Sequence, residues 1–196
     1  MVNFTYRNFY FRITFLLLLL CSGGIAAQTQ TFATQLIDVD PVAGHVTNAA
    51  AAHDGNLATA ATVRANSGIA LGIGAYDGYI EVGYTSPVPA NTTSFIRIDT
   101  EDDLLRVLLG GGLGELLSDV LGTVLIGNQE FTVEAKNGST VVLSADSTDP
   151  NTFDSARVRV VTNAAGELFI AMTPSQSYSS IRITNSIGSL LGLGNT

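Results

Sequence analysis

The chain has 196 residues, a formal net charge of −8 and one cysteine, Cys21. All 17 acidic residues lie at or beyond Asp38, so the chain repels phosphate backbones, and this disfavours nucleic acid as a partner. One cysteine cannot form an intramolecular disulfide, so the fold must depend on its apolar core or on bound metal.

Residues 1–27 have the order of a secretory signal peptide. Arg7 and Arg12 supply positive charge, the apolar run ITFLLLLL (13–20) follows, and small residues come next. The run is shorter than the ~20 apolar residues of a membrane-spanning helix. We therefore predict a secreted or outer-cell-surface protein, cleaved after Ala27, with no transmembrane segment after cleavage.

Lipoprotein processing at Cys21 is the alternative at this end of the chain. Bacterial lipoproteins usually have a small residue before the cysteine, and here that residue is Leu20. Cleavage after Ala27 would leave 169 of the 196 residues, enough for one domain. We predict a lead-in segment over residues 28–44 and one β domain over residues 45–196.

Most periodic stretches of this domain alternate with period two. In SFIRID (94–99), for example, Ile96 and Ile98 face one way while Arg97 and Asp99 face the other. Such alternation is typical of antiparallel sheets with one buried face. The predicted core consists of Ile80, Val82, Ile96, Ile98, Phe131, Val133, Val158, Val160, Ile181 and Ile183.

Turn sequences separate these strands. Asn137-Gly138 predicts a type I′ hairpin, and the segment 163–166 predicts a second, longer hairpin. Strands at this spacing indicate an all-β fold, an antiparallel β-sandwich of jelly-roll type.

A leucine- and glycine-rich segment (102–127) interrupts the pattern. Residues 115–121 predict a short helix that ends at Gly122, so we expect a helical insertion covering one end of the sandwich. The role of residues 104–127 stays open between a lid, a packing cover and a partner site. Their glycines match neither a dinucleotide fingerprint nor a P-loop.

The sequence offers little for catalysis. His45 and His53 are the only histidines, and there is no G-x-S-x-G nucleophile motif. Two histidines without a cysteine make a poor zinc site. Glu130 and Glu134 share one strand face, the arrangement that a carboxylate pair of a glycosidase would need. We predict no enzymatic activity, with a polysaccharide-acting enzyme as an alternative.

The stretch AHDGNLATAAT (52–62) is the sharpest candidate site. Asp54, Asn56 and Thr59 have oxygens that can order a turn by binding backbone amides, or that can bind a structural Ca²⁺. The acidic run at 99–103 leaves the same two interpretations open, a solvated helix cap or a source of calcium ligands. We expect His53 to be exposed, because it has no catalytic partners.

The residues Asp54, Gly55, Asn56 and Thr59 resemble the D-G-N-x-x-T loop of discoidin-like (coagulation-factor C-type) jelly-roll domains. The resemblance implies a β-sandwich, and a Ca²⁺ that often holds the loops of such domains together. The aromatic residue that usually follows the threonine is missing, and the chain has no Trp.

A longer stretch, roughly residues 45–193, resembles a module of large secreted surface proteins of gliding, Bacteroidetes-type bacteria. Its segments are NAAAAHDGNLATAATVRA, YIEVGY, LLGGGLGELLSDVLG, NQEFTVEAKNG and YSSIRITNSIGSLLGL. In that module a further strand follows SLLGL. The resemblance therefore implies that the sandwich lacks its final strand, or that the chain is part of a longer polypeptide.

Together these observations predict a non-catalytic adhesion or binding module. The expected partner is an extracellular glycan or a surface protein, and we expect Tyr76, Tyr79 or Tyr178 to be exposed for sugar binding. A structural or protein-interaction module is the alternative. The ligand and the oligomeric state are not specified by the sequence.

Overall fold

The computed structural model describes residues 30–66, 68, 73–99, 129–147, 149–153 and 156–187. The expected signal peptide (1–27), the leucine- and glycine-rich segment and the SLLGL stretch lie outside the described residues. The described residues from Phe32 onward belong to one compact unit.

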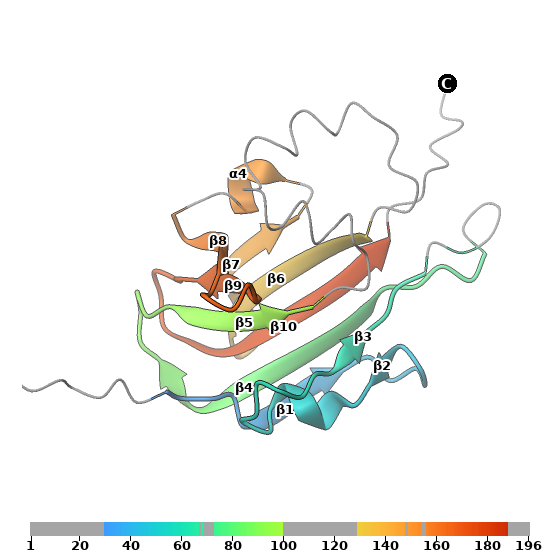
Figure 1. Ribbon diagram of the computed structural model, residues 1–196, viewed down its shortest axis with the longest axis horizontal. Coiled ribbons are helices and arrows are strands. Elements are labelled where there is room, and N and C mark those ends of the chain that lie inside the picture. Colours follow the sequence, from blue (N-terminus) through green and yellow to red (C-terminus); the bar gives the residue numbers. More distant parts are fainter. Residues whose placement is uncertain are drawn as a thin grey trace, which may run out of the picture. The chain divides into compact units, whose positions relative to one another are not determined.

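The largest sheet has five antiparallel strands (Figure 1). Their order across the sheet is β1 (Gln35–Val39), β4 (Gly78–Val88), β10 (Tyr178–Ile187), β6 (Gln129–Asn137) and β7 (Thr140–Asp146). The final described strand, β10, is therefore central, because it pairs with β4 on one side and β6 on the other.

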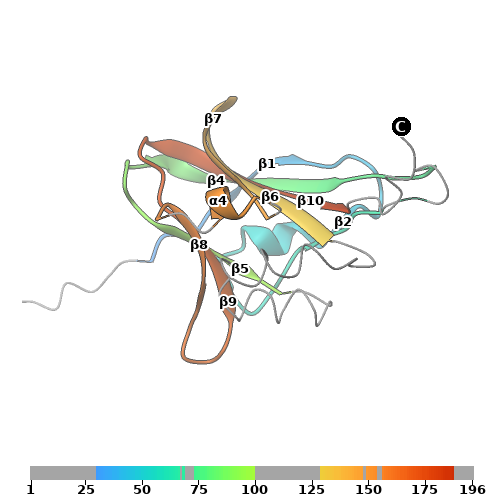
Figure 2. The same cartoon turned by 90° about the horizontal axis from the view of Figure 1, so that it is seen from above.

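A second, three-stranded sheet lies to one side of the first (Figure 2). Its order is β5 (Ser94–Ile98), β9 (Leu168–Met172) and β8 (Val158–Thr162), again antiparallel. The short strands β2 (Val46–Thr47) and β3 (Thr62–Val63) form a third sheet. The described part of the chain is thus built mainly from antiparallel sheets, which confirms the all-β prediction.

Helices contribute little to the described residues. They are the 3₁₀ helix η1 (Ala49–Ala52) and the α-helix α4 (Pro150–Phe153), each of four residues. No helix in this part of the chain is long and apolar enough to cross a membrane.

Both predicted hairpins form. At the β6–β7 hairpin, however, the two-residue loop is Gly138-Ser139, and only Gly138 has a positive φ, of 58°. A glycine at the first central position is the pattern of a type II′ turn, so the predicted type I′ turn is wrong by one position. The β8–β9 hairpin has its left-handed residue at Gly166, with a φ of 80°.

The two larger sheets share one hydrophobic core. Val133 from β6 and Ile181 from β10 pack in the same buried cluster as Val158 from β8 and Ile170 from β9. Ile80 is also buried, whereas Val82 is only partly buried. The other members of the predicted core, Ile96, Ile98, Phe131, Val160 and Ile183, are partly buried and pack against the cluster.

The segment predicted as a lead-in (28–44) contains strand β1, which pairs with β4 at one edge of the large sheet. Near β3 the backbones come very close together. A Cβ atom on Gly78 would lie 2.2 Å from the carbonyl oxygen of Arg64, so only glycine fits at this position.

Candidate functional site

The structure brings the three predicted loop residues together. Oδ1 of Asp54 accepts a 2.8 Å hydrogen bond from the Asn56 N–H, and Oδ2 accepts a 2.7 Å bond from the Thr59 hydroxyl. Oδ1 of Asn56 accepts a bond of 3.0 Å from the Ala58 N–H. The hydrogen bond from the Thr59 hydroxyl has the larger effect on the pKa of Asp54, and the bond from the Asn56 N–H has a smaller one. Both hold this pKa below its ordinary value. These oxygens therefore order the loop.

The loop is also fastened to its surroundings. Gly55 has a φ of 74° and lies beside the ring of Phe32. A Cβ atom on Gly55 would lie 3.7 Å from the nearest atom of that ring. The guanidinium of Arg97, on β5, donates to the carbonyl of Leu57. Arg97 also pairs with Glu167 at 3.2 Å. The loop is thus tied to the three-stranded sheet.

A calcium ion at Asp54, Asn56 and Thr59 stays a prediction. Within the described ranges, no group of three or more His, Cys, Asp or Glu side chains is placed to hold a metal ion. The loop offers one carboxylate with neighbouring hydroxyl, amide and carbonyl oxygens, the kind of oxygen donors that Ca²⁺ prefers.

Sequence reasoning missed the arrangement around His45. Nδ1 of His45 lies 2.8 Å from Oδ2 of Asp40, and its ring stacks on Tyr76 with a centroid separation of 3.6 Å. A hydrogen bond from the Val42 N–H lowers the pKa of Asp40, and the hydrogen bond with His45 adds a smaller effect in the same direction. His53, expected to be exposed, is half-buried at the end of η1. The pairing of His45 with Asp40 fixes the turn that leads into β2.

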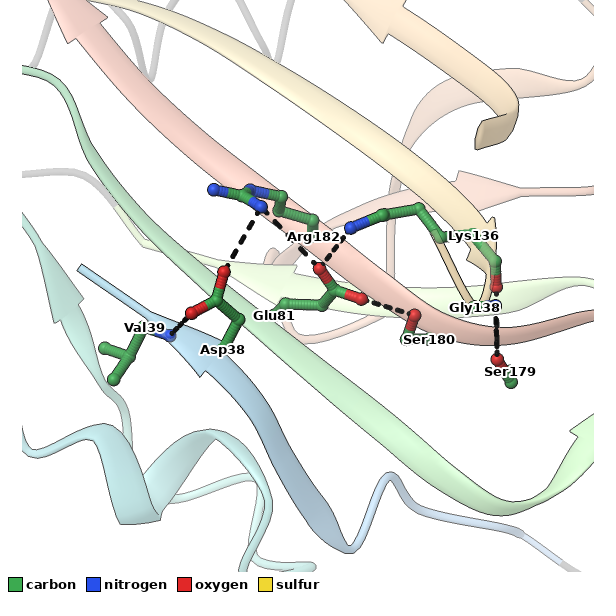
Figure 3. Close-up of polar contacts among 8 residues, drawn as sticks. All are labelled: Asp38, Val39, Glu81, Lys136, Gly138, Ser179, Ser180 and Arg182. Carbon is green, nitrogen blue, oxygen red and sulfur yellow. Dashed lines mark hydrogen bonds and ion pairs between the residues drawn. The ribbon is translucent and has the colours of Figure 1, made fainter. Parts of the chain in front are cut away.

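A polar network lies on the outer face of the large sheet (Figure 3). Glu81, on β4, is only 2% exposed. Its Oε2 lies 2.5 Å from Nζ of Lys136 on β6, and its Oε1 accepts a 2.6 Å bond from Ser180 on β10. Arg182 joins it at 3.8 Å and pairs with Asp38 at 3.5 Å.

The electrostatics of this network are balanced. Burial raises the pKa of Glu81, but the hydrogen bonds from Lys136 and Ser180 and the charges of Lys136 and Arg182 together outweigh burial, so the net pKa is lowered. The guanidinium of Arg182 also lies 3.7 Å from the centroid of the Tyr79 ring. Two cations thus match the two carboxylates of Glu81 and Asp38, and the network links four neighbouring strands.

Glu130 and Glu134 lie on the same face of β6, as predicted, because Val133 and Ala135 occupy the core face. Burial raises the pKa of Glu130, and Asp146 and Asp77 add to the effect. Four strand residues separate the Cα atoms of the pair by about 13 Å.

The outer face of the three-stranded sheet has a different character. Phe95 on β5 and Arg159 on β8 both pair with Ala171 on β9, so they flank it in one cross-strand row. The next row has Arg97, Phe169 and Val161 in the same order. We call this surface the Phe95 face, and its residues are Phe95, Arg97, Arg159, Val161, Phe169 and Ala171.

Phe95 is the most accessible aromatic ring of the described residues, at 60% exposed. Leu57, whose carbonyl binds Arg97, is 44% exposed. From the sequence we expected Tyr76, Tyr79 or Tyr178 to be exposed instead. Tyr178 is fully buried, so that expectation is wrong, because its hydroxyl bonds Ser94 at 2.6 Å in the core. Tyr76 and Tyr79 are partly covered by His45 and Arg182.

Comparisons with known proteins give no relatives: no protein-family model, no curated protein and no solved structure matches the chain.

Proposed function

We propose that this protein is a non-catalytic adhesion or binding module, secreted or held at the cell surface, that binds glycans through the Phe95 face. The proposal includes a discoidin-like β-sandwich, which the shared core of the two larger sheets supports. The observation that carries the functional proposal is the exposed ring of Phe95 beside polar side chains on an antiparallel sheet.

A sugar ring has apolar faces and a rim of hydroxyl groups, so its binding site needs both kinds of contact. An apolar body with a few placed polar groups is the usual composition of ligand sites. On the Phe95 face, the ring of Phe95 supplies an apolar platform. Arg97 and its partner Glu167, 33% and 38% exposed, supply donors and acceptors within the same sheet.

A glycan array tests this proposal. We expect the wild-type protein to bind at least one class of glycan, and Phe95→Ala to weaken the binding tenfold or more, about 1.4 kcal/mol. Val141→Ala is the matched control, since Val141 is another exposed apolar residue (44%), on β7. Equal binding by the wild type and Phe95→Ala would refute a site at this face.

A protein-interaction module is the second candidate, and the edge strand β1 favours it. Leu36 and Ile37 are 40% and 51% exposed there, and β1 pairs only with β4 in the large sheet. An open strand edge can pair with a strand of another chain. Absence of glycan binding, together with self-association that Ile37→Lys abolishes, would favour this candidate.

A further inference from the structure

We infer that residues 54–59, here called the DGNLAT loop, form one wall of the glycan site. The side chain of Leu57 contacts the bound sugar, and Arg97 and Thr59 hold Leu57 in position. The inference rests on the proposed function and adds a second segment of the chain to the same site. It is carried by the contacts that join this loop to the Phe95 face.

Arg97 brings two distant segments of the chain together on the Phe95 face. It lies two residues beyond Phe95 on β5, so both side chains are on the same side of the strand, with Cα atoms about 7 Å apart. Its Nη1 donates a hydrogen bond to the Leu57 carbonyl, and its Nη2 lies 3.2 Å from Oε1 of Glu167. The DGNLAT loop therefore meets this face within two residues of Phe95.

The second partner of Arg97 is itself fixed by the β8–β9 hairpin. Oε2 of Glu167 accepts a 2.7 Å hydrogen bond from the side-chain amide of Asn163. The Glu167 N–H donates a 2.9 Å bond to Oδ1 of Asn163. A guanidinium presents its N–H donors in a rigid planar fork, so partners on two of its nitrogens fix its orientation. Arg97 is thus anchored to the three-stranded sheet at one nitrogen and holds the loop at another.

The DGNLAT loop is also ordered by its own hydrogen bonds. The hydroxyl of Thr59 lies 2.7 Å from Oδ2 of Asp54 and 2.8 Å from the carbonyl oxygen of Asn56. Leu57 lies inside the turn that these bonds close, and it is 44% exposed. An apolar side chain on an ordered loop can be covered by a ligand with little further loss of conformational entropy. Leu57 is therefore prepared to contact a ligand.

A wall beside the platform suits a sugar better than the platform alone. Small-molecule sites are concave, and they combine apolar contacts with a few placed polar groups. Phe95 supplies the apolar platform, and Leu57 supplies a second apolar contact at the side where Arg97 binds the loop. Arg97 and Glu167 are partly exposed at the same place, so sugar hydroxyl groups can reach them. The arrangement favours a sugar unit that packs one face on Phe95 and one edge against Leu57.

Affinity electrophoresis tests the inference, with dextran, xylan, galactomannan or polygalacturonate as the probe in a native gel. The polymer that retards the wild type most is used for every variant, well below the melting temperatures. We expect Leu57→Ala to weaken binding about fivefold, because apolar contact is lost while the carbonyl that Arg97 binds remains. Thr59→Val should weaken binding by a similar factor, because the loop loses its order. Thr59→Ser, which keeps the hydroxyl, should bind as the wild type does.

Leu36→Ala is the matched control, since Leu36 is similarly exposed, at 40%, but lies on β1 of the large sheet. Wild-type binding by both Leu57→Ala and Thr59→Val, with loss in Phe95→Ala, would overturn the inference but leave the proposed function standing. Equal loss in Leu36→Ala and Leu57→Ala, or in Thr59→Ser and Thr59→Val, would also overturn the inference. Absence of binding to every polymer and to every glycan on the array would overturn both.

Discussion

The hydroxyl of Thr59 donates a 2.7 Å hydrogen bond to Oδ2 of Asp54, and it also lies 2.8 Å from the carbonyl oxygen of Asn56. One hydroxyl thus closes the turn that the sequence DGNLAT begins. In this closed loop the Leu57 carbonyl accepts a hydrogen bond from Arg97, so the loop is linked to the Phe95 face.

Replacement of Thr59 by valine should loosen the loop. Thr59→Val keeps the shape but removes the donor, so we expect the melting temperature to fall by a few degrees. Thr59→Ser keeps the hydroxyl and should behave as the wild type. Thermal unfolding followed by circular dichroism measures the difference, and identical melting of Thr59→Val and wild type would contradict the role of this bond.

Chelation tests whether a cation is needed at the same loop. A calcium ion bound by the oxygens of Asp54, Asn56 and Thr59 would stabilise only the folded protein, so we expect EDTA to lower the melting temperature. A melting temperature that EDTA leaves unchanged would contradict the calcium site. A fall with EDTA that added Ca²⁺ reverses in the wild type, but not in Asp54→Asn, would place calcium at this site.

Removal of the buried carboxylate should be costly. Glu81→Gln leaves Lys136 without its partner inside the network, and loss of one member of a buried pair costs about 3 kcal/mol. Glu134→Gln is the control, since Glu134 is partly buried on the same face of the sheet. Urea denaturation gives the two free energies of unfolding. Similar values for both variants would show that the network contributes no stability.

The carboxylate of Glu81 should also make the stability of the fold depend on pH. The pKa of Glu81 is lowered in the folded protein from its ordinary value of 4.5, so the unfolded chain takes up the proton first as pH falls. The stabilisation is therefore complete above pH 4.5 and is lost as pH falls through the lower folded pKa. We expect the difference in stability between wild type and Glu81→Gln to shrink in that range. A constant difference down to pH 2 would contradict this.

Ser94 joins two tyrosines inside the core. Its hydroxyl lies 2.9 Å from that of Tyr84 and 2.6 Å from that of Tyr178, and burial raises the pKa of Tyr178 to about 12. Ser94→Ala should cost about 1–3 kcal/mol, because buried hydroxyls lose a partner. Tyr178→Phe in that background should recover part of the loss. The exposed Ser144→Ala serves as control, and equal stability of both alanine variants would refute the role of Ser94.

The sequence predicted those features that depend on neighbouring residues. The face on which Ile96 and Ile98 lie depends only on the alternation within their own strand. The hydrogen bonds that order the turn at Asp54, Asn56 and Thr59 join residues within a stretch of six. Contacts between distant segments were missed. Tyr178 is buried because it reaches Ser94, 84 residues away, and Arg97 meets Leu57, 40 residues away. Nothing local indicates either partner.

One signal for the candidate site was present in the sequence. In SFIRID, Phe95 has the same parity as Arg97 and Asp99, and so it had to lie on the wet face of its strand. An aromatic residue on a wet face is a better indication of a binding surface than a tyrosine chosen by residue type alone. His45 gave no such signal, because its stacking partner Tyr76 is distant in the sequence and meets it only through the fold.

Chemical-shift mapping by NMR shows where a glycan binds and so tests binding at the Phe95 face. A glycan that binds on the array is added to the ¹⁵N-labelled protein. We expect the shifted amides to cluster on β5, β8 and β9, around Phe95, Arg159 and Ala171. Shifts confined to the five-stranded sheet, or no shifts at saturating glycan, would contradict it.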